Sequence, residues 1–144
     1  MSRALDGIVI LDLTQSFWAS LGVALLADFG AEVLRVEDAA SRGDGSDRDA
    51  ARARTPWDWE RELADRNKKS LAVDLKQPRG REILYRLAEK SDVFLSNLAA
   101  DNLAAWGLTY EELRAVNPRL VYAITSGYGR SATTTKPAFD MTVQ

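Results

Sequence analysis

The sequence predicts an α/β protein built on a doubly wound, mostly parallel sheet. Residues 8–13 (IVILDL) form a continuous apolar run of strand length, as in strands that are buried on both faces. Residues 20–29 (SLGVALLADF) carry a single charge and predict a buried helix. Strand-like and helix-like runs then alternate along the chain, and such alternation favours parallel pairing through right-handed crossovers.

Each further element has its own local signal. Gly30 ends the first helix, Pro78 suits the first turn of a second, and Thr109 with Glu112 has the spacing of a capping box. The other expected strands are residues 32–37, 71–75, 92–95 and 120–125, and the other expected helical segments are residues 78–90, 102–106 and 109–116.

One domain accounts for the whole chain. It has 144 residues, of which 46% are hydrophobic, enough for a core. Residues 38–56 are rich in Asp, Arg, Ala, Gly and Ser with few apolar anchors, and we expect them to form a mobile loop.

Composition argues against several functional classes. The formal net charge of −2 disfavours nucleic-acid binding, and no apolar run reaches the roughly 20 residues of a membrane span. The absence of cysteine and histidine removes thiol chemistry, the commonest general base and the commonest metal ligand. No pattern indicates a metal site, and we expect a cytoplasmic protein.

Ligands of open parallel sheets lie beyond the carboxyl ends of the strands. Lys76 follows the third expected strand and precedes a helix N-terminus, while Asn97 follows the fourth. From the residues alone, a solvated lysine and a turn-forming asparagine are the favoured interpretations. The junction between the first strand and helix has no glycine, which argues against a nicotinamide dinucleotide fingerprint.

Other polar and aromatic residues favour structural roles. Lys68 and Lys69 precede the third expected strand, at the end opposite Lys76, so one small anion does not reach all three. Trp57 and Trp59 are expected to anchor the preceding loop, with an apolar pocket wall as the alternative. Asp12 and Asp74 lie within expected strands, where a satisfied structural role is favoured.

Taken in order, six stretches resemble the class III CoA-transferases. They are LDGIVILDLT (5–14), LLADFGAEVLRVE (25–37), NKKSLAVDLK (67–76), SDVFLSN (91–97), WGLTYEELRAVNPRLVYAITSGYG (106–129) and PAFDMTVQ (137–144). This family includes formyl-CoA:oxalate and carnitine CoA-transferases, with 2-methylacyl-CoA racemases as relatives. The resemblance implies a Rossmann-like domain linked to a smaller domain, with two chains interlocked as a homodimer.

The resemblance also implies a reaction. Family enzymes move CoA from an acyl-CoA to a small carboxylic acid through an aspartyl-CoA thioester and anhydride intermediates, with no permanently bound cofactor. A carboxylate nucleophile needs neither cysteine nor histidine. The family's nucleophilic aspartate follows the segment of Asp140, beyond Gln144. Residues 1–144 are therefore expected to be an incomplete CoA-binding domain that is inactive alone.

Site residues follow from the matching positions. The resemblance assigns Lys76 and Asn97 to CoA contacts, and Val73 to an apolar contact with the adenine end. It places Phe17 near the thioester and Asp140 in a supporting catalytic position. A sixth residue, Lys136, corresponds to a further CoA-contacting lysine.

Departures from the family pattern leave alternatives open. Residues 96–102 (SNLAADN) lack the usual arginine, proline and glycine, and Asp38 stands where family members have a basic residue. Ala19 and Ser20 replace a glycine–proline pair. These changes allow a catalytically degenerate binding or scaffold subunit. An acyl-CoA racemase or isomerase is a weaker alternative, because Phe139 replaces the racemase histidine.

Overall fold

The computed structural model describes residues 2–39 and 59–129. Within these ranges the strands are β1 (Val9–Leu13), β2 (Glu32–Asp38), β3 (Lys68–Val73), β4 (Val93–Ser96) and β5 (Val121–Ile124). The helices are α1 (Phe17–Asp28), α3 (Trp59–Asp65), α4 (Pro78–Ala88), α5 (Ala100–Ala105) and α6 (Tyr110–Val116).

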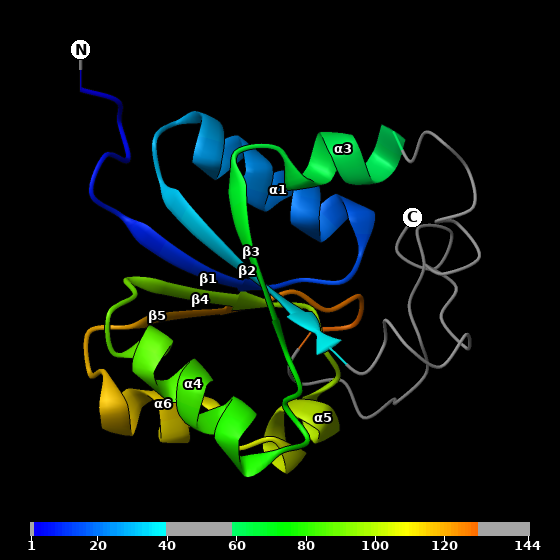
Figure 1. The fold of residues 1–144 in the computed structure, drawn as a ribbon, viewed down its shortest axis with the longest axis vertical. Coiled ribbons are helices and arrows are strands. Elements are labelled where there is room, and N and C mark those ends of the chain that lie inside the picture. The colour runs from blue at the N-terminus through cyan, green and yellow to red at the C-terminus, as the bar shows by residue number, and fades with distance from the viewer. Residues whose placement is uncertain (1, 40–58, 130–144) are drawn as a thin grey trace.

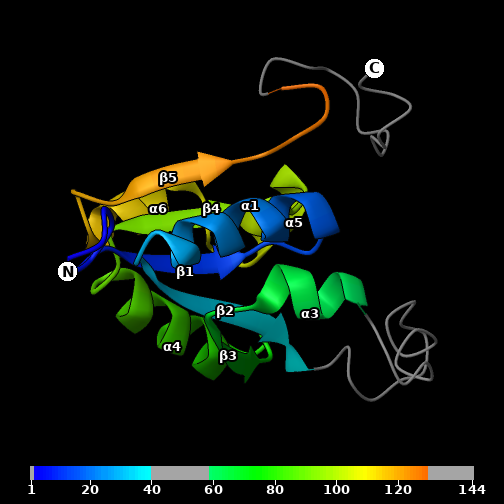
Figure 2. The ribbon, with the colours of Figure 1, turned by 90° about the horizontal axis from the view of Figure 1, so that it is seen from above.

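The described residues form one five-stranded, all-parallel sheet in the order β3-β2-β1-β4-β5. Helices α1 and α3 cover one face, and α4, α5 and α6 cover the other (Figures 1 and 2). This arrangement confirms the predicted doubly wound α/β class. The strand order reverses between β1 and β4, and such a switch point is where open parallel sheets bind ligands.

Alternating side chains of the strands build two cores. Leu11 and Leu13 of β1 face α4, α5 and α6 in the larger cluster, which also contains Phe94 and Leu113. Ile10 faces α1, together with the second cluster of Val23, Ala27, Ala31 and Val33. Because β1 is buried on both faces, it reads as the continuous apolar run seen in the sequence.

Helix α1 differs from the expected buried helix. Its inner side is buried, but Trp18 and Leu25 on its outer side are 63% and 49% exposed. It also begins earlier than predicted, at Phe17, because the Ser16 hydroxyl accepts a hydrogen bond from the N–H of Ala19 (3.4 Å). The expected helix start at Ser20 was therefore wrong.

Two further expectations need correction. Strand β3 was expected over residues 71–75 but begins at Lys68, because pairing with β2 starts at Val33 opposite Lys68. Asp38, expected to begin a loop, is the last residue of β2. Most of that expected loop lies outside the described residues. Helix α3 was not predicted at all. The remaining elements occur with ends shifted by one or two residues.

None of the helices in the described ranges has the length and apolarity that a bilayer crossing needs.

Candidate ligand-binding edge of the sheet

The loop between β1 and α1 is held by side chains on both sides. Asp12 Oδ1 accepts hydrogen bonds from the backbone N–H (2.9 Å) and the hydroxyl (2.6 Å) of Thr14. The next residue, Gln15, donates its N–H to Asn97 Oδ1 (2.7 Å). Ser16 then caps α1. The loop at the carboxyl end of β1 is therefore held residue by residue.

Asn97 lies at the switch point of the sheet. It follows β4 directly, and its side-chain oxygen is used by the loop after β1. Among the described residues its Nδ2 has no hydrogen-bond partner, so two N–H donors are left for a ligand. The expected turn-forming role was wrong, because the Asn97 oxygen bonds to a distant loop and the local turn uses Ser96, whose hydroxyl accepts from the N–H of Leu98 (3.1 Å).

An aromatic cluster flanks the same loop. Phe17 contacts the rings of Trp18 (centroids 5.0 Å apart) and Trp59 (5.8 Å), both edge to face. Trp59 is 61% exposed. Part of its ring is therefore open to solvent, while its contact with Phe17 anchors α3 to α1. Aromatic edge-to-face pairs of this kind stabilise by about 0.5–1.5 kcal/mol beyond their buried area. Trp57 lies outside the described residues.

Lys76 stands at the other side of the edge, on the loop between β3 and α4. Its N–H donates to Asp74 Oδ1 (2.9 Å), and its carbonyl accepts from the Arg81 guanidinium (3.1 Å). The side chain is exposed, and its ammonium contacts no other described group. Three strand spacings separate β3 from β4, or about 14 Å, so Lys76 and Asn97 suit an extended ligand rather than a compact anion.

A buried polar cluster lies beneath α1 and α3. The Lys68 ammonium donates to Asp12 Oδ2 (2.8 Å), to the Ser20 carbonyl (2.8 Å) and to Ser20 Oγ (2.7 Å). Arg35 donates to Ser20 Oγ (2.6 Å) and pairs with Asp65 of α3. Burial lowers the pKa of Lys68, and the Asp12 carboxylate opposes that change. These groups tie α1 and α3 to the sheet.

Comparison with known proteins identifies the family of the chain. The sequence pattern of CoA-transferase family III matches residues 5–144. The chain belongs to that family.

Similar family members are CoA-transferases with several substrates. The chain is 39% identical over 132 residues to succinyl-CoA--D-citramalate CoA-transferase of Chloroflexus aurantiacus, covering 90% of this chain and 32% of that protein. It is 35% identical to human succinyl-CoA:glutarate CoA-transferase (90% and 29%) and 33% identical to formyl-CoA:oxalate CoA-transferase of Streptomyces avermitilis (100% and 35%). The chain thus spans about a third of the length of these relatives.

Solved structures show the same fold. A CAIB/BAIF family protein from Brucella suis has a TM-score of 0.78 at 25% identity, covering 99% of this chain and 38% of that one. A hypothetical protein from Mycobacterium tuberculosis has the same TM-score at 30% identity, covering 97% and 38%.

The residues that the CoA-transferase resemblance selects fall into three groups. Phe17 and Asn97 adjoin the same loop, and Lys76 lies three strands away along the edge. Val73 is buried in the larger core, opposite Asp38 of β2, so little of its side chain is open to a ligand. The other two, Asp140 and Lys136, lie outside the described residues.

Sequence reasoning missed the ion pair between Lys68 and Asp12. Each residue was assigned a structural role, but nothing in the local pattern pairs them, because they are 56 positions apart. The usable signal was an acidic residue inside an otherwise apolar central strand, since a buried charge requires a partner.

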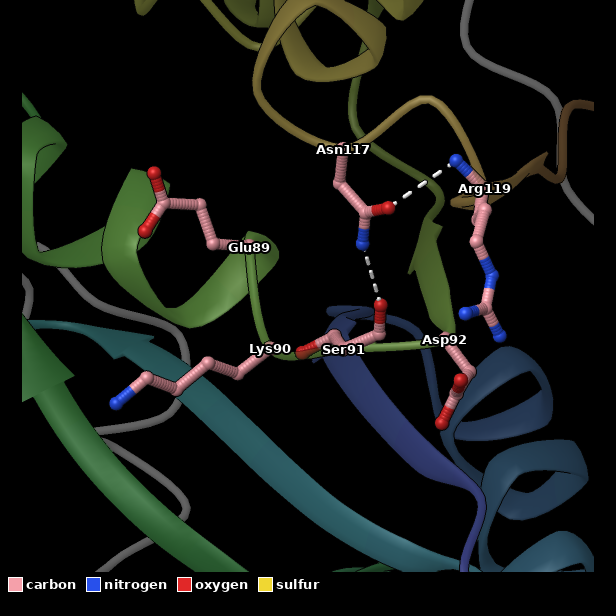
Figure 3. Close-up of a pocket in the computed structure, with 6 residues that line it drawn as sticks. All are labelled: Glu89, Lys90, Ser91, Asp92, Asn117 and Arg119. Atoms are coloured by element: carbon pink, nitrogen blue, oxygen red, sulfur yellow. Dashed lines mark hydrogen bonds between the residues drawn. The ribbon is translucent and has the colours of Figure 1, made fainter.

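A separate pocket of about 140 Å³ lies at the amino ends of the strands (Figure 3). The amide of Asn117 donates to the carbonyls of Ser91 (2.8 Å) and Ala88 (3.0 Å) and accepts from the N–H of Arg119 (3.1 Å). These bonds join loops, so the pocket is a structural feature on the side opposite the ligand edge. Its lining residues are Glu89, Lys90, Ser91, Asp92, Asn117 and Arg119.

No group of three or more acidic residues among the described ones is gathered to hold a metal ion.

Proposed function

We propose that this chain is the CoA-binding, N-terminal part of an acyl-CoA:carboxylate CoA-transferase. The donor is an acyl-CoA, the acceptor is a small carboxylic acid, and the CoA group passes through an aspartyl-CoA thioester. The nucleophilic aspartate is supplied downstream of residue 144. Family membership over residues 5–144 supports the chemistry, and the similar relatives supply the substrate class.

One observation carries the assignment of the site. The Asn97 side chain joins the loops after β1 and β4 and keeps its N–H donors free among the described residues. The donors therefore stand at the switch point, where this class of sheet binds ligands. Lys76 contributes a cation at the far side of the same edge, and Phe17 with its aromatic neighbours contributes an apolar wall.

This division of roles fits the shape of CoA. The molecule is long, with phosphates toward one end and a thioester at the other. We assign the phosphate-bearing end to Lys76 and the thioester end to the loop of Gln15 and Phe17. Asn97 is assigned to the part of CoA between these two ends. Lys136 and Asp140 complete the site in this proposal, as a CoA contact and a supporting catalytic carboxylate. Val73 borders the adenine end through the part of its side chain left open.

We propose further that the complete enzyme is a cytoplasmic homodimer. Asp38, at the end of β2 beside Val73, departs from the pattern of CoA-binding relatives, and residues 96–102 (SNLAADN) lack its arginine, proline and glycine. These departures favour one second candidate, a degenerate subunit that binds CoA without turnover. The two differ in whether the complete protein transfers CoA between an acyl-CoA and a carboxylate.

Calorimetric titration with CoA tests the site. We expect micromolar binding that weakens with added salt, because an exposed ammonium–phosphate contact is screened within about 8–10 Å. Lys76→Ala should raise the Kd by about fivefold, since an exposed charge pair contributes up to about 1 kcal/mol. Lys90→Ala, an exposed lysine at the opposite edge, is the matched control and should leave the Kd unchanged. Equal effects of the two variants would remove Lys76 from the site.

A further inference from the structure

A single buried ammonium joins the two ends of the ligand-facing loop. Lys68 Nζ donates to Asp12, which precedes the loop, and to both the carbonyl and the hydroxyl of Ser20, which follows it in the first turns of α1. The side chains of Lys68 and Asp12 are 1% and 0% exposed. All three hydrogen atoms of the ammonium therefore have a partner, and the two ends of the loop are held at a fixed separation.

Stability alone does not explain this ion pair. Removing two charges from water costs several kcal/mol per ion, and replacing a buried pair by apolar side chains of similar volume is often neutral or stabilising. An apolar pair at these positions would fill the same core space between the sheet and α1. It would not provide an acceptor for Thr14 or a donor for Ser20, so the interactions unique to the charged pair are those with the loop.

The Asp12 carboxylate also binds a residue within the loop. While Oδ2 of Asp12 receives the ammonium, Oδ1 accepts from the N–H and hydroxyl of Thr14. The following N–H, of Gln15, is held from the other side by Asn97. Lys68 thus acts at a distance on the segment that precedes Phe17, without touching the ligand edge itself.

We propose that Lys68 and Asp12 are positioning residues that hold the loop of Thr14, Gln15 and Ser16 in its binding-competent form. The identity of the ligand rests on the proposed function, but the effect on the loop does not. The apparent affinity falls in proportion to the fraction of molecules whose loop is in the competent form. A loop that is already held in that form therefore keeps the full affinity. Loss of the pair should therefore weaken binding while the core stays intact.

The first test needs no substitution. Amide hydrogen exchange should show Thr14 and Gln15 protected far above an unstructured peptide, because both N–H groups are bonded to side-chain oxygens. Exchange of these two amides at unstructured rates would overturn the proposal, whether or not the chain binds CoA.

Two double variants test the pair. Asp12→Leu/Lys68→Met replaces it with apolar side chains, and we expect a folded chain with faster exchange at Thr14 and a Kd for CoA raised about tenfold, as for a loop that is competent about a tenth of the time. Asp12→Asn/Lys68→Met restores the acceptor for Thr14 and should recover part of both losses. In both Kd and Thr14 exchange rate, Asp12→Asn/Lys68→Met should therefore lie between the parent and Asp12→Leu/Lys68→Met. A purely structural role does not predict this ranking among proteins of similar melting temperature.

The neighbouring ion pair between β3 and β2 is the control. Lys69 and Glu32 are joined over 2.6 Å but are 70% and 49% exposed on the other face. Glu32→Gln/Lys69→Met should change neither loop exchange nor the Kd.

The outcomes separate the two proposals. Unchanged loop exchange and Kd in the apolar double variant would overturn the positioning role, and so would failure of both double variants to fold, since the pair would then be a requirement of the fold. A parent chain that shows the predicted exchange but no CoA binding would contradict the proposed function and leave the positioning role standing.

Discussion

The backbone N–H of Gln15 donates to Asn97 Oδ1 over 2.7 Å, across 82 positions of the chain. This bond joins the loops that follow β1 and β4, the two adjacent strands between which the strand order reverses. One amide side chain thereby fixes the distance between the two loops. Its oxygen accepts this bond, and the proposed function assigns its nitrogen to the ligand.

Two substitutions at Asn97 separate these functions. Asn97→Ala removes both, and we expect a loss of about 1 kcal/mol in the free energy of unfolding from the missing hydrogen bond, together with weaker CoA binding. Asn97→Asp keeps an acceptor for Gln15 but replaces the donor with a negative charge. Its stability should stay near that of the parent while its Kd for CoA rises about tenfold or more, since a hydrogen bond to a charged group contributes about 1.5–3 kcal/mol.

Asn102→Ala is the matched control for these variants. Asn102 is exposed on α5, close in sequence, and its side chain makes no hydrogen bond with the described residues. Denaturant titration and calorimetry should give parent values. If Asn97→Asp also binds CoA as the parent does, the amide nitrogen does not face the ligand.

Phe17 is expected to discriminate between CoA and an acyl-CoA. The proposed function places its ring near the thioester, so Phe17→Leu should weaken binding of acetyl-CoA by about two- to tenfold, the equivalent of an aromatic contact of about 0.5–1.5 kcal/mol. Binding of free CoA should change less. Phe29→Leu, at the exposed far end of the same helix, should affect neither ligand. Equal weakening of both ligands by Phe17→Leu would place the ring elsewhere on CoA.

Much of the framework could be predicted from local sequence signals. The apolar run of β1 and the capping box are local features, and the structure contains both, with Thr109 accepting from the N–H of Glu112. Asn97 could be placed at the carboxyl ends of the strands because the alternation of strands and helices implies parallel strands. Such predictions succeed where the cause lies within a few residues.

The missed features depend on contacts distant in sequence. Helix α3 has seven residues, too few to be stable in isolation, and it persists because Ala64 is buried and Asp65 pairs with Arg35 of β2. The early start of β3 has a similar cause. Lys68 can be a buried strand residue because its ammonium pairs with the Asp12 carboxylate. A local pattern assigns both segments to polar surface, because the compensating partner is not visible in it.

Alanine substitutions at two glycines should change the free energy of unfolding in opposite directions. A Cβ at Gly80 of α4 would lie 2.0 Å from the Asp74 carbonyl oxygen, so the helix must move away from the loop that carries Lys76. Gly80→Ala should lower the free energy of unfolding by about 1–3 kcal/mol, as overpacked substitutions do. A Cβ at Gly22 of α1 meets nothing within 4 Å, and Gly22→Ala should add about 0.5–1 kcal/mol. Urea titration of both variants measures the contrast, and a stable Gly80→Ala protein would show that the contact of α4 with the loop is adaptable.

Tyr85 links α4 to the turn before α6 and makes stability depend on alkaline pH. Its hydroxyl donates to the Gly107 carbonyl (2.6 Å), and burial, with a smaller effect of the Glu112 charge, raises its pKa above the ordinary value of 10.0. The folded state therefore holds the phenol proton more tightly than the unfolded chain. Its contribution to stability is complete below pH 10 and is lost as the pH rises through the raised pKa.

Tyr85→Phe removes the donor and leaves the Gly107 carbonyl without it. We expect a loss of about 1 kcal/mol in the free energy of unfolding at neutral pH, and a smaller difference from the parent above pH 10, where the parent loses the same interaction. Tyr110→Phe, at an exposed ring on α6, is the matched control and should leave the free energy of unfolding at neutral pH unchanged. Urea unfolding across pH 7 to 11 compares the three proteins. A difference between parent and Tyr85→Phe that grows with pH would contradict the raised pKa, because it would mean that the folded state favours the phenolate.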